Sequence, residues 1–559
     1  MNGSNNTMSG KIITRIVSPL EKALADTRPE NYPALEKQSA LLGETLDFQL
    51  LVLDNDESIP SSRRLTLSVT GMPGEYSVRE AVSVFCDFPT YRHDTSRGTP
   101  YYIDSKTGTY PDILQPTDGN FIRPVPGRTT SLWFTLTPEN AGEHRISITL
   151  SDGENVVAEN TLSLTVVPAE LPEPRLIFTQ WFHCDCLASY YNVPVFSERH
   201  WEIIAEYMKC AAKNGMNCIL TPILTPPLDT EIGGERPTVQ LISVKITENG
   251  CEFGFDLLDR WIKTAGECGI KYFEISHLFS QWGAEFAPKV VAEKNGETVR
   301  IFGWDTPGTG AEYTAFVSQL LPALISRLKA LGVIDRCIFH ISDEPNLEQF
   351  DGYVKAKNVV APFLEGLKVA DALSSVEFYK KGAVALPIPS NDHIEAFIEA
   401  GVSERWTYYC CGQWDRVGNR FIAYPSSRNR ILGIQFYKYD IRGFLQWGYN
   451  FWYSMGSRRL INPYTCQSAD GQLPAGDPFS VYPSPDGTPL ESLRQDVFRE
   501  ALSDVAALEL CERYIGRDAV IKMIDDAAGY DLTFAHYPAE PEFILALREK
   551  VNRIIAEHC

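Results

Sequence analysis

The sequence predicts an α/β fold class, in which a (β/α)8 barrel follows an N-terminal β-sandwich and carries a helical C-terminal extension. Two observations lead to this prediction. Residues 12–170 contain short runs that alternate apolar and polar side chains, as half-buried strands do. Over about 300 further residues, strand-like and helix-like segments alternate, which is the pattern of a parallel barrel. We expect the sandwich over residues 1–172, the barrel over 173–515 and the helical extension over 516–559.

The sandwich is predicted from four alternating runs and the segment that ends them. Pro168 to Pro174 form a proline-rich stretch that cannot continue a sheet, so we place the end of the first domain there. Two of the runs, HRISITL and TLSLTVV, are expected to pair as antiparallel neighbours. The four runs are SRRLTLSVTG, TTSLWFTLTP, GEHRISITLSDG and NTLSLTVVP.

The barrel is predicted from the alternation that follows. After a first strand in LIFTQWF, Ser197 is expected to cap a helix whose apolar residues recur with the 3.6-residue period, ending near Gly215. A helix is also expected from Tyr313 to Leu331. The later strands are expected in MNCILTPI, KYFEISHLF, DRCIFHISDEP, SVEFYK, RWTYYCC and GFLQWGYNFW.

The composition excludes several classes of partner. Of the 559 residues, 44% are hydrophobic and 22% are charged, and the formal net charge is −21. Because this charge repels phosphate groups, we expect no nucleic-acid partner. No run of 18 apolar residues is present, so we expect no membrane partner.

Two features favour a cytoplasmic protein. The N-terminal sequence MNGSNNTMSGKIITRIV lacks the basic region, apolar stretch and cleavage site of a signal peptide. The 13 cysteines are an odd number scattered along the chain, which favours reduced thiols over a disulfide framework. We therefore expect cytoplasmic localisation.

The strongest candidate for chemistry is the motif HISDEP, residues 340–345. Active sites of such barrels lie at the carboxyl ends of the strands, and Asp343 and Glu344 follow the apolar run CIF. Burial and proximity of two carboxylates raise the pKa of one of them, as a general acid requires. The alternative is structural, because acidic residues also favour the first turn of a helix.

Aromatic side chains near the predicted strand ends suggest a carbohydrate substrate, since the apolar faces of sugars stack on such rings. We expect Tyr379, Trp414, Trp447 and Trp452 to line the pocket, although barrel core is the other interpretation. His183, after the first strand, is expected to bind sugar hydroxyls.

Carboxylates and aromatic residues together suggest glycoside hydrolysis by one of two mechanisms. A retaining or inverting enzyme with its own nucleophile or base needs a second carboxylate across the sugar. Residues 405–455 contain no Glu, and only Asp415 and Asp440 as acids. In substrate-assisted catalysis the 2-acetamido oxygen is the nucleophile, so two neighbouring carboxylates suffice.

Several motifs together resemble a known family. HISDEP, GFLQWGYNFW, GDPFSVYP with PDGTP, and LRQDVFREALSDVAALE resemble the family formerly called domain of unknown function 4091, the catalytic barrel of glycoside hydrolase family 123. Members of that family are retaining β-N-acetylgalactosaminidases that use substrate-assisted catalysis, and they carry an N-terminal β-sandwich. The resemblance implies that Glu344 is the general acid/base and that Asp343 polarises the 2-acetamido group.

Other polar residues near strand ends receive a structural or secondary interpretation. His277 is expected to be a buried, satisfied core residue, Asp305 a lid or turn residue, and Asp477 and Tyr482 part of a loop over the barrel mouth. The motif HCDC at residues 183–186 suggests a metal, but strand alternation would place His183 and Cys184 on opposite faces. We expect no metal and no cofactor.

The sequence therefore predicts hydrolysis of a terminal β-linked N-acetylhexosamine, with N-acetylgalactosamine favoured and a glycan or oligosaccharide as partner. One alternative is a glycosidase for a sugar without the acetamido group, with Glu274, Glu377 or Asp415 as nucleophile. The other is a carbohydrate-binding protein without turnover.

Overall fold

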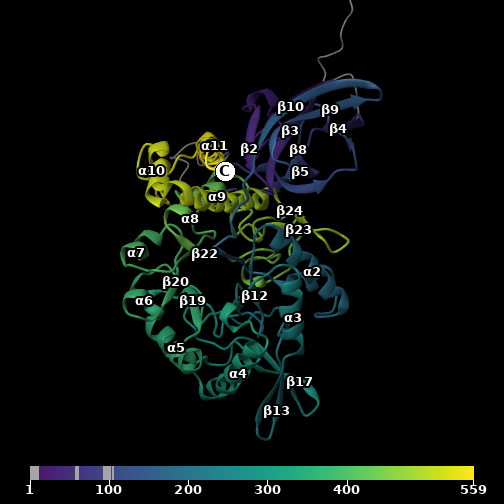
Figure 1. Cartoon of the computed structure of the whole chain (residues 1–559). Coiled ribbons are helices and arrows are strands. Elements are labelled where there is room, and N and C mark those ends of the chain that lie inside the picture. Colours follow the sequence, from purple (N-terminus) through teal and green to yellow (C-terminus); the bar gives the residue numbers. More distant parts are fainter. Residues whose placement is uncertain (1–11, 57–61, 92–101, 104–105) are drawn as a thin grey trace, which may run out of the picture. The chain divides into compact units, whose positions relative to one another are not determined.

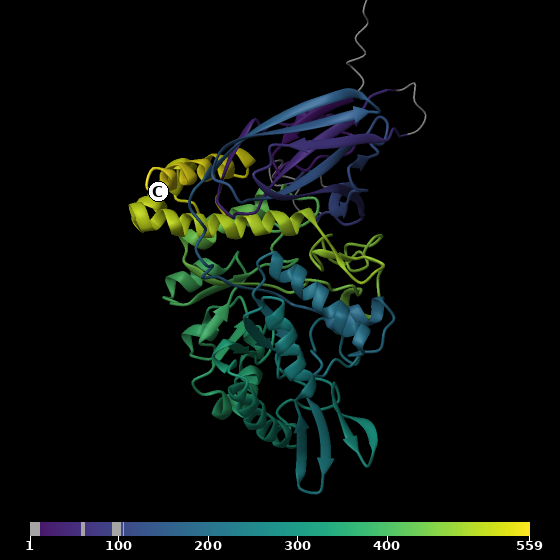
Figure 2. The same ribbon diagram turned by 45° about the vertical axis from the view of Figure 1, so that its right-hand side comes forward.

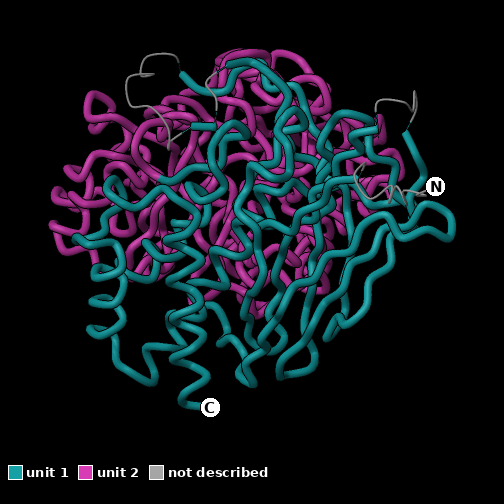
Figure 3. Tube along the Cα trace, turned by 90° about the horizontal axis from the view of Figure 1, so that it is seen from above, with its two compact units in different colours: residues 1–174, 418–439, 490–559 teal, residues 175–417, 440–489 magenta. Residues whose placement is uncertain are grey.

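The computed structural model describes residues 12–56, 62–91, 102–103 and 106–559. Residues 1–11, on which part of the expectation about a signal peptide rests, lie outside the described residues. The chain forms two compact units (Figure 3). Unit 1 comprises residues 1–174, 418–439 and 490–559, and unit 2 comprises residues 175–417 and 440–489. Among the described residues, the helices are too short or too polar to span a bilayer.

Unit 1 contains two five-stranded sheets (Figure 1). The first has the order β1 (Ile12–Val17), β3 (Leu46–Asp54), β8 (Thr129–Pro138), β5 (Gly74–Cys86) and β6 (Gly108–Pro116). The second has the order β2 (Lys37–Leu41), β10 (Asn155–Val167), β9 (Gly142–Asp152), β4 (Leu65–Thr70) and β7 (Phe121–Ile122). The antiparallel pairing predicted between HRISITL and TLSLTVV is confirmed as β9 with β10.

The alternating runs of the sequence explain why the two sheets share one core. Along β9, Ile146, Ile148 and Leu150 are buried while the residues between them are half-buried. Phe48 of β3 stacks on Phe134 of β8 with ring centroids 4.8 Å apart. Side chains of both sheets belong to a single hydrophobic cluster, so burial of one face of each sheet stabilises the pair.

Four helices complete unit 1, and two of them change the predicted domain boundaries. They are α8 (Ser427–Lys438), α9 (Leu493–Ile515), α10 (Arg517–Ala528) and α11 (Pro541–Ala556), and the last three are the yellow helices of Figures 1 and 2. We predicted α8 and α9 within the barrel, but they pack with the N-terminal sheets. The buried guanidinium of Arg430 on α8 lies 2.8 Å from Asp504 on α9, and Arg499 on α9 lies 2.6 Å from Asp47 on β3.

Unit 2 contains a nearly closed, parallel, eight-stranded barrel, as the sequence predicts. Its order is β20 (Leu386–Ile388), β19 (Lys368–Ala372), β18 (Cys337–Phe339), β15 (Tyr272–Ile275), β12 (Cys218–Thr221), β11 (Ile177–Gln180), β22 (Ile441–Gln446) and β21 (Arg405–Tyr408). The ends of the sheet meet through hydrogen bonds from the Tyr408 N–H to the Pro389 carbonyl (3.0 Å) and from the Asn391 N–H to the Tyr408 carbonyl (2.8 Å).

The helices of unit 2 follow the strands along the chain. Ser197 caps α2 as predicted, because its hydroxyl accepts a hydrogen bond from the His200 N–H. The prediction of a strand in SVEFYK is wrong: this segment ends in the helix α6, and the barrel instead uses β19 and β20. The helices are α1 (Cys184–Tyr190), α2 (Glu198–Lys213), α3 (Asp256–Glu267), α4 (Ala311–Ala330), α5 (Phe350–Leu364), α6 (Glu377–Lys380) and α7 (Ile394–Glu399).

A four-stranded sheet interrupts the barrel and packs against the barrel helix α4, where the rings of Phe253 and Phe316 lie 5.9 Å apart; β13 and β17 of this sheet are labelled near α4 in Figure 1, and Figure 2 gives a turned view. Its order is β14 (Gly250–Gly254), β13 (Ser243–Thr247), β16 (Val290–Lys294) and β17 (Glu297–Phe302). The short strands β23 (Val481–Pro483) and β24 (Pro489–Glu491) follow the last barrel strand along the chain.

A close contact in the barrel core generates a stability prediction. A Cβ atom on Gly443 of β22 would lie 1.9 Å from the ring of the buried Trp406 on β21. We expect Gly443→Ala to lower the free energy of unfolding by about 1–3 kcal/mol, because the core cannot accommodate the methyl group. Chemical denaturation followed by tryptophan fluorescence measures this change.

Gly266→Ala is the matched control for this substitution. Gly266 lies on the exposed face of α3, where an added Cβ meets nothing within 4 Å. We expect this change to stabilise by about 0.5–1 kcal/mol, because alanine loses less backbone entropy in a helix. Equal effects of the two substitutions would contradict the packing argument.

Candidate active site

The carboxylates predicted from HISDEP follow β18 and are held by the neighbouring strand β19. The buried carboxylate of Asp371 accepts hydrogen bonds from the backbone N–H groups of Ile341 (2.9 Å) and Ser342 (3.3 Å). The Glu344 N–H donates to the Ala372 carbonyl at 3.0 Å. The backbone on both sides of Asp343 is therefore fixed at the carboxyl ends of the barrel strands.

These carboxylates line a cavity of about 420 Å³ within unit 2. Trp181, Tyr408 and Trp447, which lie at or just beyond the ends of other barrel strands, contribute to its wall. The cavity is large enough for a sugar ring, and it combines apolar surface with a few converging polar groups, as ligand sites do.

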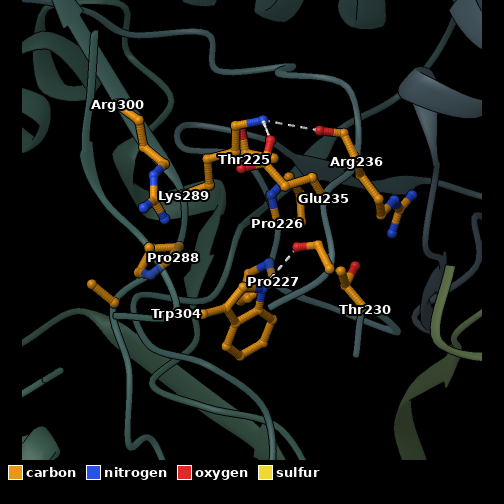
Figure 4. Close-up of a pocket in the computed structure, with 13 residues that line it drawn as sticks. Thr225, Pro226, Pro227, Thr230, Glu235, Arg236, Pro288, Lys289, Arg300 and Trp304 are labelled. Carbon is orange, nitrogen blue, oxygen red and sulfur yellow. Dashed lines mark hydrogen bonds and ion pairs between the residues drawn. The ribbon is translucent and has the colours of Figure 1, made fainter. Parts of the chain in front are cut away.

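A second hollow is much smaller and is lined by residues from the segments 225–236 and 287–304 (Figure 4). Its volume is about 30 Å³, which has room for a water molecule but not for a sugar. The Lys289 ammonium at its edge pairs with Glu235 at 2.7 Å, and the Trp304 indole N–H donates to the Gly234 carbonyl at 3.0 Å. The larger cavity is therefore the candidate active site.

Asp343 and Glu344 differ in their surroundings. The Gln281 amide donates to the Asp343 carboxyl at 2.8 Å, and burial followed by the charge of Glu344 raises the pKa of Asp343 well above its usual range. Burial also raises the pKa of Glu344. The Tyr408 hydroxyl donates to the Glu344 carboxylate at 2.5 Å and opposes this shift, but the pKa remains raised.

The pKa of each carboxyl group is raised, so each favours its protonated form more than an exposed carboxyl group does. Because neighbouring like charges disfavour double ionisation, the pair favours a state with one proton and one negative charge. Such a pair can donate a proton to a leaving oxygen and hold a partner N–H at the same time.

A third carboxylate, which the sequence analysis did not single out, also lines the cavity. Burial raises the pKa of Asp229 to about 7, although Arg236 opposes the shift. Its backbone is left-handed, with φ 52°, and its N–H donates to the Gln281 side-chain oxygen at 2.5 Å. Gln281 therefore joins Asp229 to Asp343. Asp229 follows the barrel strand β12 and Gln281 follows β15. The position of these residues after barrel strands is the sequence signal that could have indicated them.

Beneath the cavity lies a buried ion-pair network in the barrel core. The His340 ring nitrogen lies 2.8 Å from the Glu274 carboxylate, which also accepts from the Trp181 indole N–H at 2.9 Å. Burial would lower the pKa of His340, but hydrogen bonds and charges of Asp371 and Glu274 outweigh burial and raise it to about 10. His340 is therefore a cation flanked by two carboxylates.

The nucleophiles proposed as alternatives from the sequence lie elsewhere. Glu274 belongs to the buried network, and Glu377 lies on α6 beside Lys380 at 3.5 Å. Asp415 lies 3.9 Å from Arg416. Two further carboxylates, those of Asp229 and Glu231, line the cavity with Asp343 and Glu344. Glu231 is paired with Arg458 at 2.6 Å, whereas Asp229 is buried and its pKa is affected by the charge of Glu344.

His183, which was predicted to bind sugar hydroxyls, lies in a buried hydrogen-bond network beside the cavity wall. It precedes α1, is buried, and its Nε2 lies 2.9 Å from the Trp447 carbonyl while Arg236 lies 3.0 Å from Nδ1. Burial, followed by the charge of Arg236, lowers the pKa of His183 to about 3, so the ring is neutral. It does not line the cavity. Arg236 also pairs with Asp185 at 2.7 Å.

The strand alternation predicted to separate His183 from Cys184 is wrong, because Cys184 begins the helix α1. Ligand atoms of His277, His340 and Asp371 lie within 4.8 Å of one another. The two imidazole rings are stacked at 4.6 Å with 20° between their planes, so their in-plane lone pairs do not converge on one ion. The Nε2 atom of His340 already faces the Glu274 carboxylate at 2.8 Å, so the geometry of this group does not fit a metal.

Of the four predicted aromatic residues, Trp447 lines the cavity. Its indole N–H donates to the buried Asp477 carboxylate at 3.0 Å, which gives Asp477 a structural role. Trp452 is fully buried against Tyr190 and Tyr207, so its predicted place in the pocket is wrong.

Tyr379 and Trp414 do not line the cavity either. Tyr379 lies on the helix α6, because SVEFYK does not form the expected strand. Tyr482 is buried with its ring against Phe479, and Asp305 is paired with Arg300 at 2.7 Å outside the cavity. His277 is buried as predicted, but its ring nitrogens find no hydrogen-bond partner among the residues that the structure describes, so the predicted satisfied state is not seen.

Comparison with known proteins agrees with the geometry. A sequence model described as the catalytic domain of glycoside hydrolase 123 matches residues 181–511, more than half of the chain. A solved family 123 glycoside hydrolase from Clostridium perfringens is 17% identical, with 98% of each chain covered and a TM-score of 0.73. A family 39 glycoside hydrolase from Bacteroides cellulosilyticus is 10% identical over 87% of this chain and 82% of its own, with a TM-score of only 0.33. No curated protein matched.

The barrel, the cavity at its strand ends and the matching family model define a class of protein, the barrel glycosidases. Within that class, the chain belongs to glycoside hydrolase family 123. The resemblance seen in the sequence motifs is thereby confirmed.

The hydrogen bond from Tyr408 to Glu344 generates a prediction about pH. In Tyr408→Phe the Glu344 carboxylate loses a donor that stabilises its charged form, so its pKa is expected to rise. If Glu344 must be protonated to act, the basic limb of the kcat/KM profile moves to higher pH. Hydrolysis of an aryl glycoside across pH 5–10 measures the limb.

Tyr191→Phe is the control for the loss of a tyrosine hydroxyl. Its hydroxyl lies 2.9 Å from that of Tyr207, and Tyr191 does not line the cavity. We expect its pH profile to match that of the parent. A basic limb that stays in place in Tyr408→Phe would show that Glu344 does not control it.

Proposed function

We propose that the protein hydrolyses terminal β-linked N-acetylhexosamine, with N-acetylgalactosamine favoured, by retaining, substrate-assisted catalysis. The observation that carries the proposal is the adjacent pair Asp343 and Glu344 in one buried cavity, each with its own hydrogen-bond partner. The family and the relative from Clostridium perfringens, which was described for hydrolysis of glycolipid glycans, support a glycan substrate.

In the first step the acetamido oxygen of the substrate attacks the anomeric carbon, and the bond to the leaving oxygen breaks. Glu344 gives its proton to that oxygen, and Asp343 accepts a hydrogen bond from the acetamido N–H. An oxazoline-type intermediate forms. Because the substrate N–H stabilises the charged form of Asp343, binding favours the shared proton on Glu344.

In the second step Glu344, now a carboxylate, takes a proton from water, and the water oxygen attacks the anomeric carbon. The bond from that carbon to the acetamido oxygen breaks, which restores the acetamido group. Two inversions at one carbon give overall retention.

Substitution of the pair tests the assignment. We expect Glu344→Gln and Asp343→Asn each to lower kcat/KM by about a hundredfold or more for aryl β-N-acetylgalactosaminide, because each removes a group used in the first step. The panel also includes the β-N-acetylglucosaminide, β-galactoside and β-glucoside. Glu377→Gln and Asp415→Asn, which lie outside the cavity, are controls with unchanged rates. Full activity of either pair variant would overturn the proposal.

A second candidate function is a glycosidase for a sugar without the acetamido group, and the position of Asp229 in the cavity favours testing it. In that mechanism Asp229 would be the nucleophile. We expect Asp229→Asn to retain hydrolysis of 2-acetamido sugars within about tenfold, because the substrate supplies its own nucleophile. A thiazoline mimic of the oxazoline should inhibit the parent.

The opposite outcome would favour the second candidate. In that case the parent hydrolyses plain galactoside or glucoside, Asp229→Asn abolishes this turnover, and the thiazoline does not inhibit. A parent that binds sugars without any turnover would instead support a carbohydrate-binding protein.

A further inference from the structure

The cavity has a buried floor and an exposed mouth. Trp181, Leu445 and Asp343 on its wall are almost fully buried. Trp282 and Met455 also line it but are 48% and 49% exposed. A sugar whose glycosidic bond lies at the carboxylates occupies the buried part, so the exposed side chains meet what extends outward, namely the leaving group.

Trp282 is held in a costly backbone conformation. It has φ 53°, and Gly283 and Ala284 after it have φ 111° and 59°. Left-handed backbone is unfavourable for a non-glycine residue and persists where the surrounding structure imposes it. The segment therefore presents the indole at the mouth at the expense of backbone strain.

Hydrogen bonds tie Trp282 to the catalytic segment and fix its position. Its N–H donates to the Asp343 carbonyl at 2.9 Å, and its carbonyl accepts from the Gln349 side chain at 2.5 Å. The preceding residue, Gln281, donates to the Asp343 carboxyl. A Cβ on Gly283 would lie 3.0 Å from Gln349, so the close approach of this clamp favours glycine there.

We propose that the indole of Trp282 is the platform for the leaving-group sugar, stacking on the apolar face of the ring attached to the cleaved oxygen. An exposed aromatic side chain at a rigid position suits this contact, because little conformational entropy is lost on binding. The inference rests on the proposed function only in placing bond cleavage at Asp343 and Glu344. Trp282 is therefore a residue that determines specificity for the leaving group. The N-acetylhexosamine that is released from it is bound in the buried part of the cavity.

The test compares ligands with and without a leaving group. For a disaccharide ending in β-N-acetylgalactosamine, we expect Trp282→Ala to lower kcat/KM about tenfold, since one stacking contact is lost. The inhibition constant of the thiazoline, which has no leaving group, should change by less than about twofold. Trp282→Phe should recover most of the loss.

Phe85→Ala is the control, since Phe85 is a similarly exposed aromatic residue on β5 of unit 1, outside the cavity. Unchanged kcat/KM in Trp282→Ala would overturn the inference. Equal losses for the disaccharide and the thiazoline would also overturn it, because Trp282 would then act on the sugar before the bond or on the fold.

The outcome for Trp282 is distinguishable from the outcome for the proposed function. If the parent hydrolyses only sugars without the acetamido group, the same comparison uses a disaccharide of that sugar and a monosaccharide-sized iminosugar inhibitor. If no disaccharide is turned over, calorimetry on Glu344→Gln compares the binding of the disaccharide with that of the monosaccharide. We expect the disaccharide to bind more tightly than the monosaccharide to Glu344→Gln, and this difference should disappear in Glu344→Gln/Trp282→Ala. A difference that persists in the double variant would contradict the platform.

Discussion

Two adjacent carboxyl groups can share one buried cavity only if the backbone that carries them is held in place. In this barrel the neighbouring strand β19 provides that constraint. Asp371 accepts two N–H groups of the segment after β18, and the Ala372 carbonyl accepts the N–H of Glu344. Without these bonds, repulsion and the cost of burial would move Asp343 and Glu344 apart or toward solvent.

The charges around this segment have opposing effects on the pKa of Asp343. Below it, protonated His340 lies between Glu274 and Asp371, and its positive charge lowers the pKa of Asp343. The charge of Glu344 and burial act in the opposite direction. The net result is a raised pKa for both carboxyl groups, which favours the protonated acid that the proposed proton transfer requires.

The success and failure of sequence-based prediction have identifiable physical reasons. Asp343 and Glu344 could be predicted because an apolar run of three residues before them indicates a strand end, where barrel sites lie. Trp452 was predicted to line the pocket but packs against Tyr207 of the helix α2. The position of an aromatic residue after a strand end does not specify whether its side chain faces the pocket or a neighbouring helix. Trp282 and Asp229 lie in loops whose left-handed backbone has no local sequence pattern.

The sequence by itself determined the alternation of strands and helices, the family, and the position of Asp343 and Glu344 at a strand end, because these depend on local periodicity and contiguous motifs. Tertiary structure decided that α8 and α9 pack with the N-terminal sheets, and that Gln281 joins Asp229 to Asp343. Such contacts unite residues that are distant along the chain, and the free energy that selects them arises only when the packed surfaces exclude water.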